Sequence, residues 1–391
     1  MRLTDMGCET PESRLELCSK CIARTGIEAK RVGGKECILC GGLLWRVEEI
    51  ASRIAEKLSE YEFNTFLVGC KLNGSIKAVE DYLAEKYGMQ EDRSIKFQLN
   101  REIGARIAIT LGKTTEFKKP DITVIFSPET LDVELIIRPL YIYGRYKKRV
   151  RNIPQTRWVC GACKGRGCEI CNFTGKKYLT SVEELIINPV LEVCQGKQAF
   201  LHGAGREDVD ARMLGNGRPF IVEVREPRKR YINLDELREK VNEMAEGKVE
   251  VLNLSFAEAK HVEWLKETKF RKVYRAKVVF DGEVDGNRLK EALKRLEGVI
   301  SQRTPTRVEH RRADLVRKRR VYGTELLLHR GKTAVIKIDA ESGLYIKELV
   351  SGDEGRTKPS LTELLGINAR VEKLDVVAVE GGLEVNGESE R

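Results

Sequence analysis

The sequence predicts a multidomain α+β protein, and three observations carry this prediction. Residues 45–150 alternate between helical and strand patterns, which is typical of an α/β domain. From residue 178 to 380, strands of alternating polarity are separated by amphipathic helices, which indicates a largely antiparallel sheet with flanking helices. Four Cys-x-x-Cys pairs lie before and between these regions and indicate small metal-binding modules. A chain of 391 residues is long enough for two or three domains, each with its own core.

The changes of pattern along the chain predict five parts. They are a zinc module at 1–44, an α/β domain at 45–152, a cysteine-rich insert at 153–177, the larger α+β domain at 178–380 and a disordered tail at 381–391.

Hydrophobic periodicity and turn residues predict the elements of both domains. In the α/β domain we expect helices over 47–58, 76–87 and 101–111 and strands over 63–68, 121–126 and 132–137. In the larger domain we expect helices over 182–187, 234–244 and 289–296, strands over 220–224, 249–254 and 273–280, and further strands between 308 and 348.

The charge of the chain points to a polyanionic partner. The formal net charge is +10 and 33% of the residues are charged. RNA or DNA is the usual partner of such a protein, and a basic protein without one is the alternative. No apolar run approaches the roughly 20 residues that span a bilayer, and the first residues lack the apolar core of a secretory signal. We therefore expect a cytoplasmic protein with no membrane partner.

The first cysteine cluster matches a four-cysteine zinc pattern. Cys18-x-x-Cys21 and Cys37-x-x-Cys40 are separated by fifteen residues. Because cysteine fills all four ligand positions, the predicted zinc is structural and has no open position for catalysis. A redox-active pair is the alternative.

The second cluster contains two C-x-x-C pairs in direct succession: Cys160 and Cys163, followed by Gly165 and Gly167, and then Cys168 and Cys171, followed by Gly175. It resembles the zinc modules of the Hsp40 chaperone family, in which four such repeats are typical. We predict a second structural zinc here, with a metal-free or redox-active insert as the alternative. The remaining cysteines are predicted to be small buried side chains: Cys8, Cys70 and Cys194.

Two basic segments are candidates for RNA binding. Residues 138–151 interleave cationic side chains with tyrosines, which can hold phosphates and stack on bases. Residues 311–320 form the densest basic run. A solvated edge strand and a solvated face are the respective alternatives. The expected phosphate contacts are Arg145, Lys147, Lys148, Arg149, Arg317, Lys318, Arg319 and Arg320.

The stretch 203–220 is the candidate catalytic region. It contains three acids, three arginines and four glycines and runs into an apolar strand. A charged, glycine-rich loop at the mouth of a sheet favours a site, and a surface turn is the alternative. The chain has no phosphate-binding P-loop, and no G-x-G-x-x-G joins a strand to a helix, so we expect no nucleotide cofactor.

Three short motifs follow one another along the chain. Gly205-Arg206-Glu207-Asp208 resembles the G-R-x-D signature of pseudouridine synthases, and Lys272-Val273-Tyr274-Arg275-Ala276 resembles the K-x-Y-x-A/V strand that comes next in the same enzymes. Gly343-Leu344-Tyr345-Ile346-Lys347 resembles their G-x-Y-I-K/R strand, and Leu374 has the matching apolar position. With the string Gly355-Arg356-Thr357-Lys358-Pro359, the motifs are similar, over nearly the whole chain, to the archaeal and eukaryotic tRNA pseudouridine synthase 10 family. That family has an N-terminal zinc-containing THUMP domain.

This resemblance implies a cofactor-independent isomerase that acts on uridine-54 and/or uridine-55 of the TΨC arm of tRNA. It implies that Asp208 is the catalytic carboxylate, that Lys347 pairs with it and that Tyr274 stacks on a flipped-out uracil. Whether the carboxylate attacks C1′ or removes the 2′ proton stays open, and Asp210 is the alternative acid. The remaining implied contacts are an apolar floor of Ile346 and Leu374, and phosphate contacts by Arg206 and Arg218.

Two other classes of protein are considered beside this one. A non-catalytic, zinc-containing RNA-binding protein would use the acidic loop for binding or packing. Another THUMP-type RNA-modifying enzyme, a methyltransferase or a thiolase, would require S-adenosylmethionine or ATP.

Overall fold

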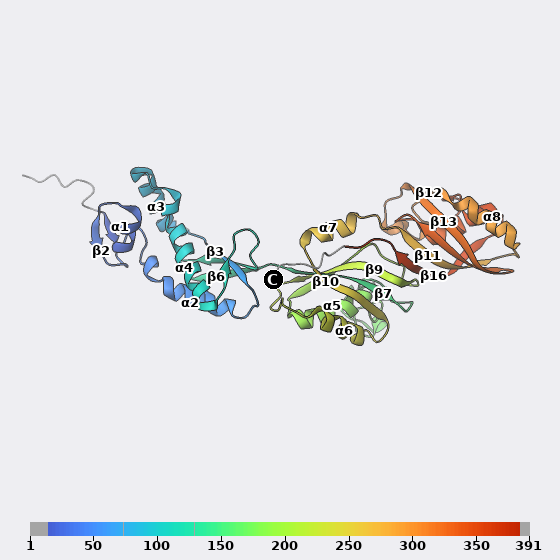
Figure 1. Cartoon of the computed structure of the whole chain (residues 1–391), viewed down its shortest axis with the longest axis horizontal. Coiled ribbons are helices and arrows are strands. Elements are labelled where there is room, and N and C mark those ends of the chain that lie inside the picture. The colour runs from blue at the N-terminus through green and yellow to red at the C-terminus, as the bar shows by residue number, and fades with distance from the viewer. Residues whose placement is uncertain (1–14, 73, 129, 384–391) are drawn as a thin grey trace, which may run out of the picture. The chain divides into compact units, whose positions relative to one another are not determined.

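The computed structural model describes residues 15–72, 74–128 and 130–383, and the chain divides into two compact units (Figure 1). The first unit contains the chain up to Pro139 together with Arg225–Tyr231. The second contains Leu140–Val224 and the chain from Ile232 onward. Cys8, the start of the predicted zinc module and residues 384–391 of the predicted tail lie outside the described residues.

The first unit is an α/β domain built on a four-stranded sheet in the order β4-β3-β5-β6. Strand β3 is parallel to β4 and β5, whereas β5 and β6 are antiparallel. Its elements are β1 (Glu16–Cys18), α1 (Ser19–Thr25), β2 (Lys30–Val32), η2 (Leu43–Trp45), α2 (Val47–Leu58), β3 (Thr65–Cys70), α3 (Gly74–Tyr87), η3 (Glu91–Arg93), α4 (Ile95–Leu111), β4 (Thr114–Thr115), β5 (Ile122–Ser127) and β6 (Asp132–Ile137).

The first cysteine cluster shares the core of this α/β domain. Cys18, Cys21, Cys37 and Cys40 are buried in one hydrophobic cluster with Ile54 and Leu58 of α2 and with the sheet. The predicted module at the N-terminus therefore packs onto the α/β domain and does not form a separate core.

The second unit is built on a ten-stranded sheet in the order β10-β7-β9-β16-β11-β14-β13-β12-β15, with β8 paired to β9. Neighbouring strands are antiparallel except β9 and β16, which are parallel over a short contact, Arg212 with Asp375 and Met213 with Val376. The strands are β7 (Leu140–Lys148), β8 (Gln198–Gly203), β9 (Arg212–Arg225), β10 (Val249–Ala257), β11 (Lys272–Phe280), β12 (Gly298–Arg303), β13 (Val316–Arg330), β14 (Thr333–Ala340), β15 (Thr357–Lys358) and β16 (Ala369–Val379).

Helices cover the two ends of this sheet, which gives the predicted α+β class. Figure 1 shows α5 and α6 beside β7 and β10, and α8 beside β12 and β13. The helices are η4 (Glu169–Cys171), α5 (Val182–Cys194), α6 (Leu234–Met244), α7 (Ala259–Glu267), α8 (Gly286–Leu296), η5 (Thr306–Arg311), α9 (Ile346–Ser351) and α10 (Leu361–Leu365). Within the described chain, no helix has both the length and the apolar character needed to cross a membrane.

The boundary between the units differs from the one predicted at residue 152. It lies at Pro139–Leu140, because β7 pairs with β9 and β10 and so belongs to the larger sheet. The larger domain is also interrupted, since Arg225–Tyr231 returns to the first unit. There Arg230 is buried and lies 3.0 Å from the Asp121 carboxylate. A strand that follows another strand directly gives no sequence signal of a change of sheet.

Three local predictions were wrong. Helix α5 continues through Pro189 to Cys194, because its buried face packs against the sheet and α6 and this packing offsets the lost hydrogen bond. The predicted loop 203–220 is half strand, since β9 begins at Arg212. The segment 343–347, expected as a strand, is a turn that leads into α9.

Candidate active site

The loop 204–211 joins β8 to β9 at the point where the two halves of the larger sheet meet. Among the described strands, the short parallel contact between β9 and β16 is the one backbone pairing between the halves, and the loop ends directly before it. Gly215, just inside β9, makes the close approach possible: a Cβ there would lie 1.7 Å from the Val377 carbonyl oxygen. This glycine therefore serves close backbone packing between β9 and β16.

A cavity of about 540 Å³ opens beside this loop. It brings together side chains from β11, β13, β16, η5, the segment before α9 and the loop itself. All seven residues predicted for catalysis or substrate contact line it: Arg206, Asp208, Arg218, Tyr274, Ile346, Lys347 and Leu374.

Asp208 is held as a carboxylate by two cations. Its Oδ1 is 3.2 Å from Arg307 Nη1 and its Oδ2 is 3.3 Å from Lys347 Nζ. Burial alone would raise the pKa of Asp208, but the charges of Arg307 and Lys347 outweigh it and the pKa is lowered. Asp208 is therefore ionised at neutral pH inside a cavity, where a reactive carboxylate is useful.

Asp210 shares Lys347 but not the cavity. Lys347 Nζ lies 2.8 Å from both Asp210 carboxylate oxygens, closer than it lies to Asp208. The Asp210 side chain is 57% exposed, against 34% for Asp208, and Asp208 alone of the two lines the cavity. Position relative to the cavity, not distance to Lys347, favours Asp208 as the reactive acid.

Arg307 is a site residue that the motifs did not identify. It bridges Asp208 and the buried carboxylate of Glu348 on α9, with Nε 2.6 Å from Glu348 Oε1. Its guanidinium also lies 5.8 Å from the ring centroid of Tyr345. Arg307 thus ties the loop 204–211 to the segment that carries Ile346 and Lys347. It sits in a basic segment after β12, which was the only signal available in the sequence.

Tyr274 and Lys272 lie two residues apart on β11, so both side chains project from the same face of the sheet. Both line the cavity and both are buried, Lys272 to 7% exposure. Burial raises the pKa of Tyr274 to about 12. Burial and the nearby charge of Arg218 lower the pKa of Lys272 to about 7, against the opposing effect of Glu207.

Arg218 does not reach outward to a phosphate, so that prediction was wrong. Its fully buried guanidinium donates to Glu207 Oε2 at 2.9 Å and to the Ala204 carbonyl at 2.7 Å. Glu207 also accepts from the hydroxyl of Tyr146 at 3.0 Å. This buried ion pair holds Glu207, a residue of the loop 204–211, to Arg218 of β9.

Two cationic side chains of the basic strand β7 also bind backbone carbonyls of the protein itself. It is an inner strand between β10 and β9, so it is not a solvated edge either. Lys148 is fully buried and donates to the carbonyls of Asp208 and Val209, both at 3.1 Å, so it fixes the loop 204–211 and cannot contact RNA. Arg145 donates to four carbonyl oxygens, including that of Asn216 at 2.7 Å. Its predicted contact with phosphate is therefore wrong too.

Lys147 and Arg149 both pair with Glu250 of β10, and their contact with RNA stays a prediction.

The basic run on β13 divides between two faces of the strand. Arg317 and Arg319 line the cavity, whereas Lys318 and Arg320 alternate with them and are exposed. A second hollow of about 510 Å³ is lined by Arg206, Arg312 and Arg317 with Val308 and Ala313. The cavity and this hollow share Arg206, Val308, Arg312 and Arg317, so cations line the approach to Asp208.

Both cysteine clusters have the geometry of a tetrahedral metal site. In each, the four Sγ atoms lie within 4.8 Å of one another. The Sγ–Sγ distance is 3.7 Å between Cys18 and Cys40, and in the second cluster it is 4.0 Å for Cys160–Cys168, 3.9 Å for Cys163–Cys171 and 3.7 Å for Cys168–Cys171. Four thiolates about 2.3 Å from a zinc ion would be about 3.8 Å apart. The residues present therefore fit zinc at both clusters.

Comparison with known proteins agrees with this fold. The model described as "Pus10, C-terminal" matches residues 141–380, and "Pus10 THUMP domain, archaeal" matches residues 50–127. The fold and the matches define a pseudouridine synthase catalytic domain joined to a THUMP domain. The chain belongs to the Pus10 family.

Curated relatives support this membership over most of the chain. "tRNA pseudouridine synthase Pus10" of Archaeoglobus fulgidus is 52% identical over 93% of this chain and 100% of that protein. The proteins of the same name from Methanothrix thermoacetophila and Methanocaldococcus jannaschii are 46% and 43% identical, over 93% and 94% of this chain and 80% and 81% of theirs. A solved structure, "Crystal Structure of a Cbf5-Nop10-Gar1 Complex", is a distant likeness with TM-score 0.31 and 19% identity over 48% of this chain and 42% of that chain.

Proposed function

We propose that this protein isomerises uridine-54, uridine-55 or both in the TΨC arm of tRNA to pseudouridine. The observation that carries the proposal is the ionised carboxylate of Asp208, which Lys347 and Arg307 hold in a cavity beside Tyr274. The relatives that share most of the chain are named tRNA pseudouridine synthases, and the basic approach to the cavity suits an RNA. We also propose that the protein is cytoplasmic and meets its tRNA substrate there.

The reaction breaks the bond from C1′ to N1, turns the uracil and forms a bond from C1′ to C5. The proton lost from C5 is balanced by one gained at N1, so the reaction needs no redox partner or energy source. Asp208 would either attack C1′ or remove the 2′ proton, and its ionised state serves both routes.

The other cavity residues have complementary roles in this proposal. Tyr274 stacks on the flipped-out uracil, and Ile346 and Leu374 form its apolar floor. Lys347 and Arg307 keep the Asp208 carboxylate ionised when the cavity holds little water. Arg206, exposed at the rim shared by the cavity and the hollow, holds a neighbouring phosphate.

Tritium release from tRNA labelled at uracil C5 tests this function. The purified chain is expected to release tritium in buffer that contains neither ATP nor S-adenosylmethionine. Transcripts with cytidine at position 54 or at position 55 then show which uridine is used. Binding of tRNA without release would instead support a non-catalytic RNA-binding protein, and release that requires either cofactor would support another modifying enzyme.

The lowered pKa of Lys272 predicts that the rate of the reaction falls at alkaline pH, which gives the pH profile an alkaline limb. Departure of the uracil places negative charge on its oxygens, which the protonated ammonium of Lys272 stabilises. Because the pKa of Lys272 is lowered to about 7, the charge is present below that pH and is lost above it, while Asp208 stays ionised. The single-turnover rate should fall about tenfold for each pH unit well above 7.

Lys272→Arg provides the control for this limb, because a guanidinium stays charged at all these pH values. The limb should move to higher pH in that variant. An unchanged limb would show that another group causes it.

Metal content is expected to be two zinc ions per chain by elemental analysis. The double variant Cys168→Ser/Cys171→Ser should retain one ion, with unfolding of the first unit unchanged. Removal of the ion at Cys18, Cys21, Cys37 and Cys40 should destabilise the first unit, because these side chains lie in its core. Two ions retained in the double variant would contradict the second site.

A further inference from the structure

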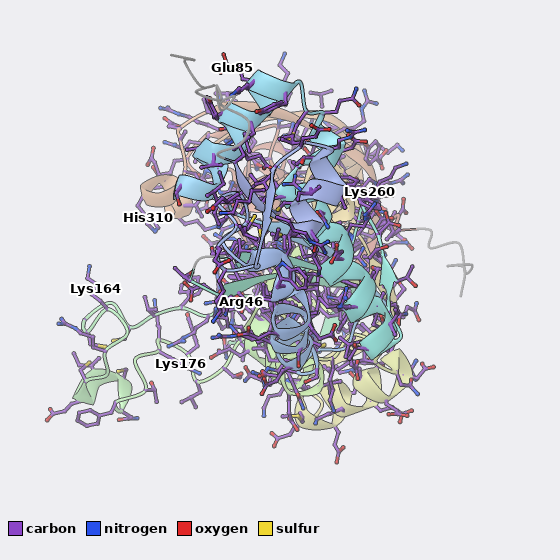
Figure 2. The ribbon with its side chains drawn as sticks, turned by 90° about the vertical axis from the view of Figure 1, so that its left-hand side faces the viewer. Arg46, Glu85, Lys164, Lys176, Lys260 and His310 are labelled. Carbon is purple, nitrogen blue, oxygen red and sulfur yellow. The ribbon has the colours of Figure 1, made fainter. Side chains whose placement is uncertain are left out.

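The segment Arg157–Leu179, which we call the cysteine arm, projects from the rest of the second unit. Its two limbs are joined by hydrogen bonds from Cys160 N to the Gly175 carbonyl at 2.8 Å and from Lys177 N to the Trp158 carbonyl at 2.9 Å. Figure 2 shows it projecting from the helices and the sheet, with Lys164 among its outer turns and Lys176 on the returning limb. We propose that the cysteine arm binds the RNA substrate at unpaired nucleotides outside the catalytic cavity.

The arm is internally rigid, so its surface is a defined feature and not a loose loop. Its two cysteine turns pack so closely that a Cβ on Gly175 would lie 2.3 Å from the Gly165 carbonyl oxygen. Backbone N–H groups of Gly167, Cys168 and Gly175 point at cysteine Sγ atoms at 3.3 Å. These contacts hold the thiols in the arrangement that fits a metal.

The outer turns expose an aromatic ring that the fold does not use. Phe173 is 72% exposed, and its φ of +58° is a left-handed conformation that bulky residues avoid. Its neighbour Asn172 is left-handed as well. A phenylalanine that is both strained and solvated gains nothing for stability, which points to a ligand. Other exposed apolar side chains of the arm are Val159, Ile170 and Leu179.

The charge of the arm selects RNA as that ligand. Glu169 is its one acid against five cations. A divalent ion with four thiolates carries −2, so the arm stays positive with metal bound. Among the described residues, the side chains of Arg157, Lys164 and Arg166 form no ion pair. An aromatic platform with cations around it holds unpaired nucleotides by stacking and by phosphate contacts. The cations are Arg157, Lys164, Arg166, Lys176 and Lys177.

The base of the arm lies at the wall of the catalytic cavity. Gln155, two residues before the arm, lines the cavity and donates to the Gly205 carbonyl at 2.9 Å. The N–H of Arg157 donates to Glu183 at the start of α5 at 3.0 Å. An RNA whose uridine enters the cavity therefore passes the foot of the arm. This step rests on the proposed function, since it takes the same RNA as substrate.

The test measures affinity and rate separately with the full-length chain and an unmodified tRNA transcript. In an Asp208→Asn background, which prevents turnover, Phe173→Ala is expected to raise Kd roughly 5- to 50-fold. Lys164→Glu/Arg166→Glu should also lower the slope of log Kd against log salt by roughly 1.5. In the active protein, kcat at saturating tRNA should stay within about twofold of the original value.

Matched variants separate binding by the arm from general effects. Lys290→Glu/Arg295→Glu makes the same charge change on the exposed face of α8 and should leave Kd unchanged. Phe173→Trp keeps an aromatic ring and should retain affinity. Unchanged zinc content in each arm variant confirms that the arm is folded.

The outcomes distinguish this inference from the proposed function. If pseudouridine forms but Phe173→Ala and the charge variant bind tRNA like the original chain, the arm inference is wrong and the function stands. Such a result would leave a protein partner as the ligand of the arm. If no pseudouridine forms but the arm variants lose affinity for tRNA, the function is wrong and the arm still binds RNA.

Discussion

Asp208→Asn is expected to lower the single-turnover rate of pseudouridine formation by at least ~10³-fold, with Kd for tRNA within about twofold. Asn keeps the shape of the side chain but can neither attack C1′ nor accept a proton. Its affinity for RNA should persist, because the cations that line the approach are unaffected. Tritium release measures the rate, and filter binding measures Kd.

Asp210→Asn is the matched control for this variant. It removes a carboxylate that contacts the same lysine from the rim, so the rate should remain within about tenfold of the original. Near-original activity in Asp208→Asn, or inactivity of Asp210→Asn alone, would show that Asp208 is not the reactive aspartate.

Arg218→Met is expected to destabilise the second unit by about 3–5 kcal/mol, because it leaves Glu207 as a buried carboxylate without its cation. The midpoint of thermal unfolding of that unit should fall by roughly 6–20 °C. Glu207 belongs to the loop 204–211, which also carries Asp208, so activity should fall as well. Differential scanning calorimetry of the full chain measures the transition of the second unit.

Two further variants test whether the unpaired Glu207 carboxylate causes the loss of stability in Arg218→Met. Adding Glu207→Gln to Arg218→Met removes the unpaired charge and should recover part of the loss. Arg238→Met breaks a half-exposed pair with Asp235 on α6 and should change stability by less than about 0.5 kcal/mol. Equal effects of Arg218→Met and Arg238→Met would contradict a special cost of the buried pair.

For elements with strong hydrophobic periodicity, the predicted bounds agreed closely with those in the structure. The helix at Leu234–Met244 and the strand at Asp132–Ile137 have the predicted bounds, because their apolar spacing and flanking turn residues leave one interpretation. The predicted α+β class is likewise confirmed. Helix α5 and strand β9 were cut short because Pro189 and the glycines of β9 read locally as breaks, whereas tertiary packing tolerates both.

The site shows a second limit of sequence reasoning. Asp208, Tyr274 and Lys347 come from three separate motifs and line one cavity, and their catalytic roles stay predictions. The motifs contain no Arg307, which meets Asp208 only through the fold. The burial of Arg218 and Lys148 could not be foreseen either, because charged side chains are usually exposed and only the three-dimensional neighbours reveal a buried pair.

Position-resolved mapping of pseudouridine in a tRNA transcript treated with the purified chain tests the central claim most directly. With no added cofactor, pseudouridine is expected at position 54, position 55 or both, and Asp208→Asn should leave both uridines unchanged. Modification only at other positions, or none by a folded, zinc-loaded protein that binds the tRNA, would contradict the proposed function.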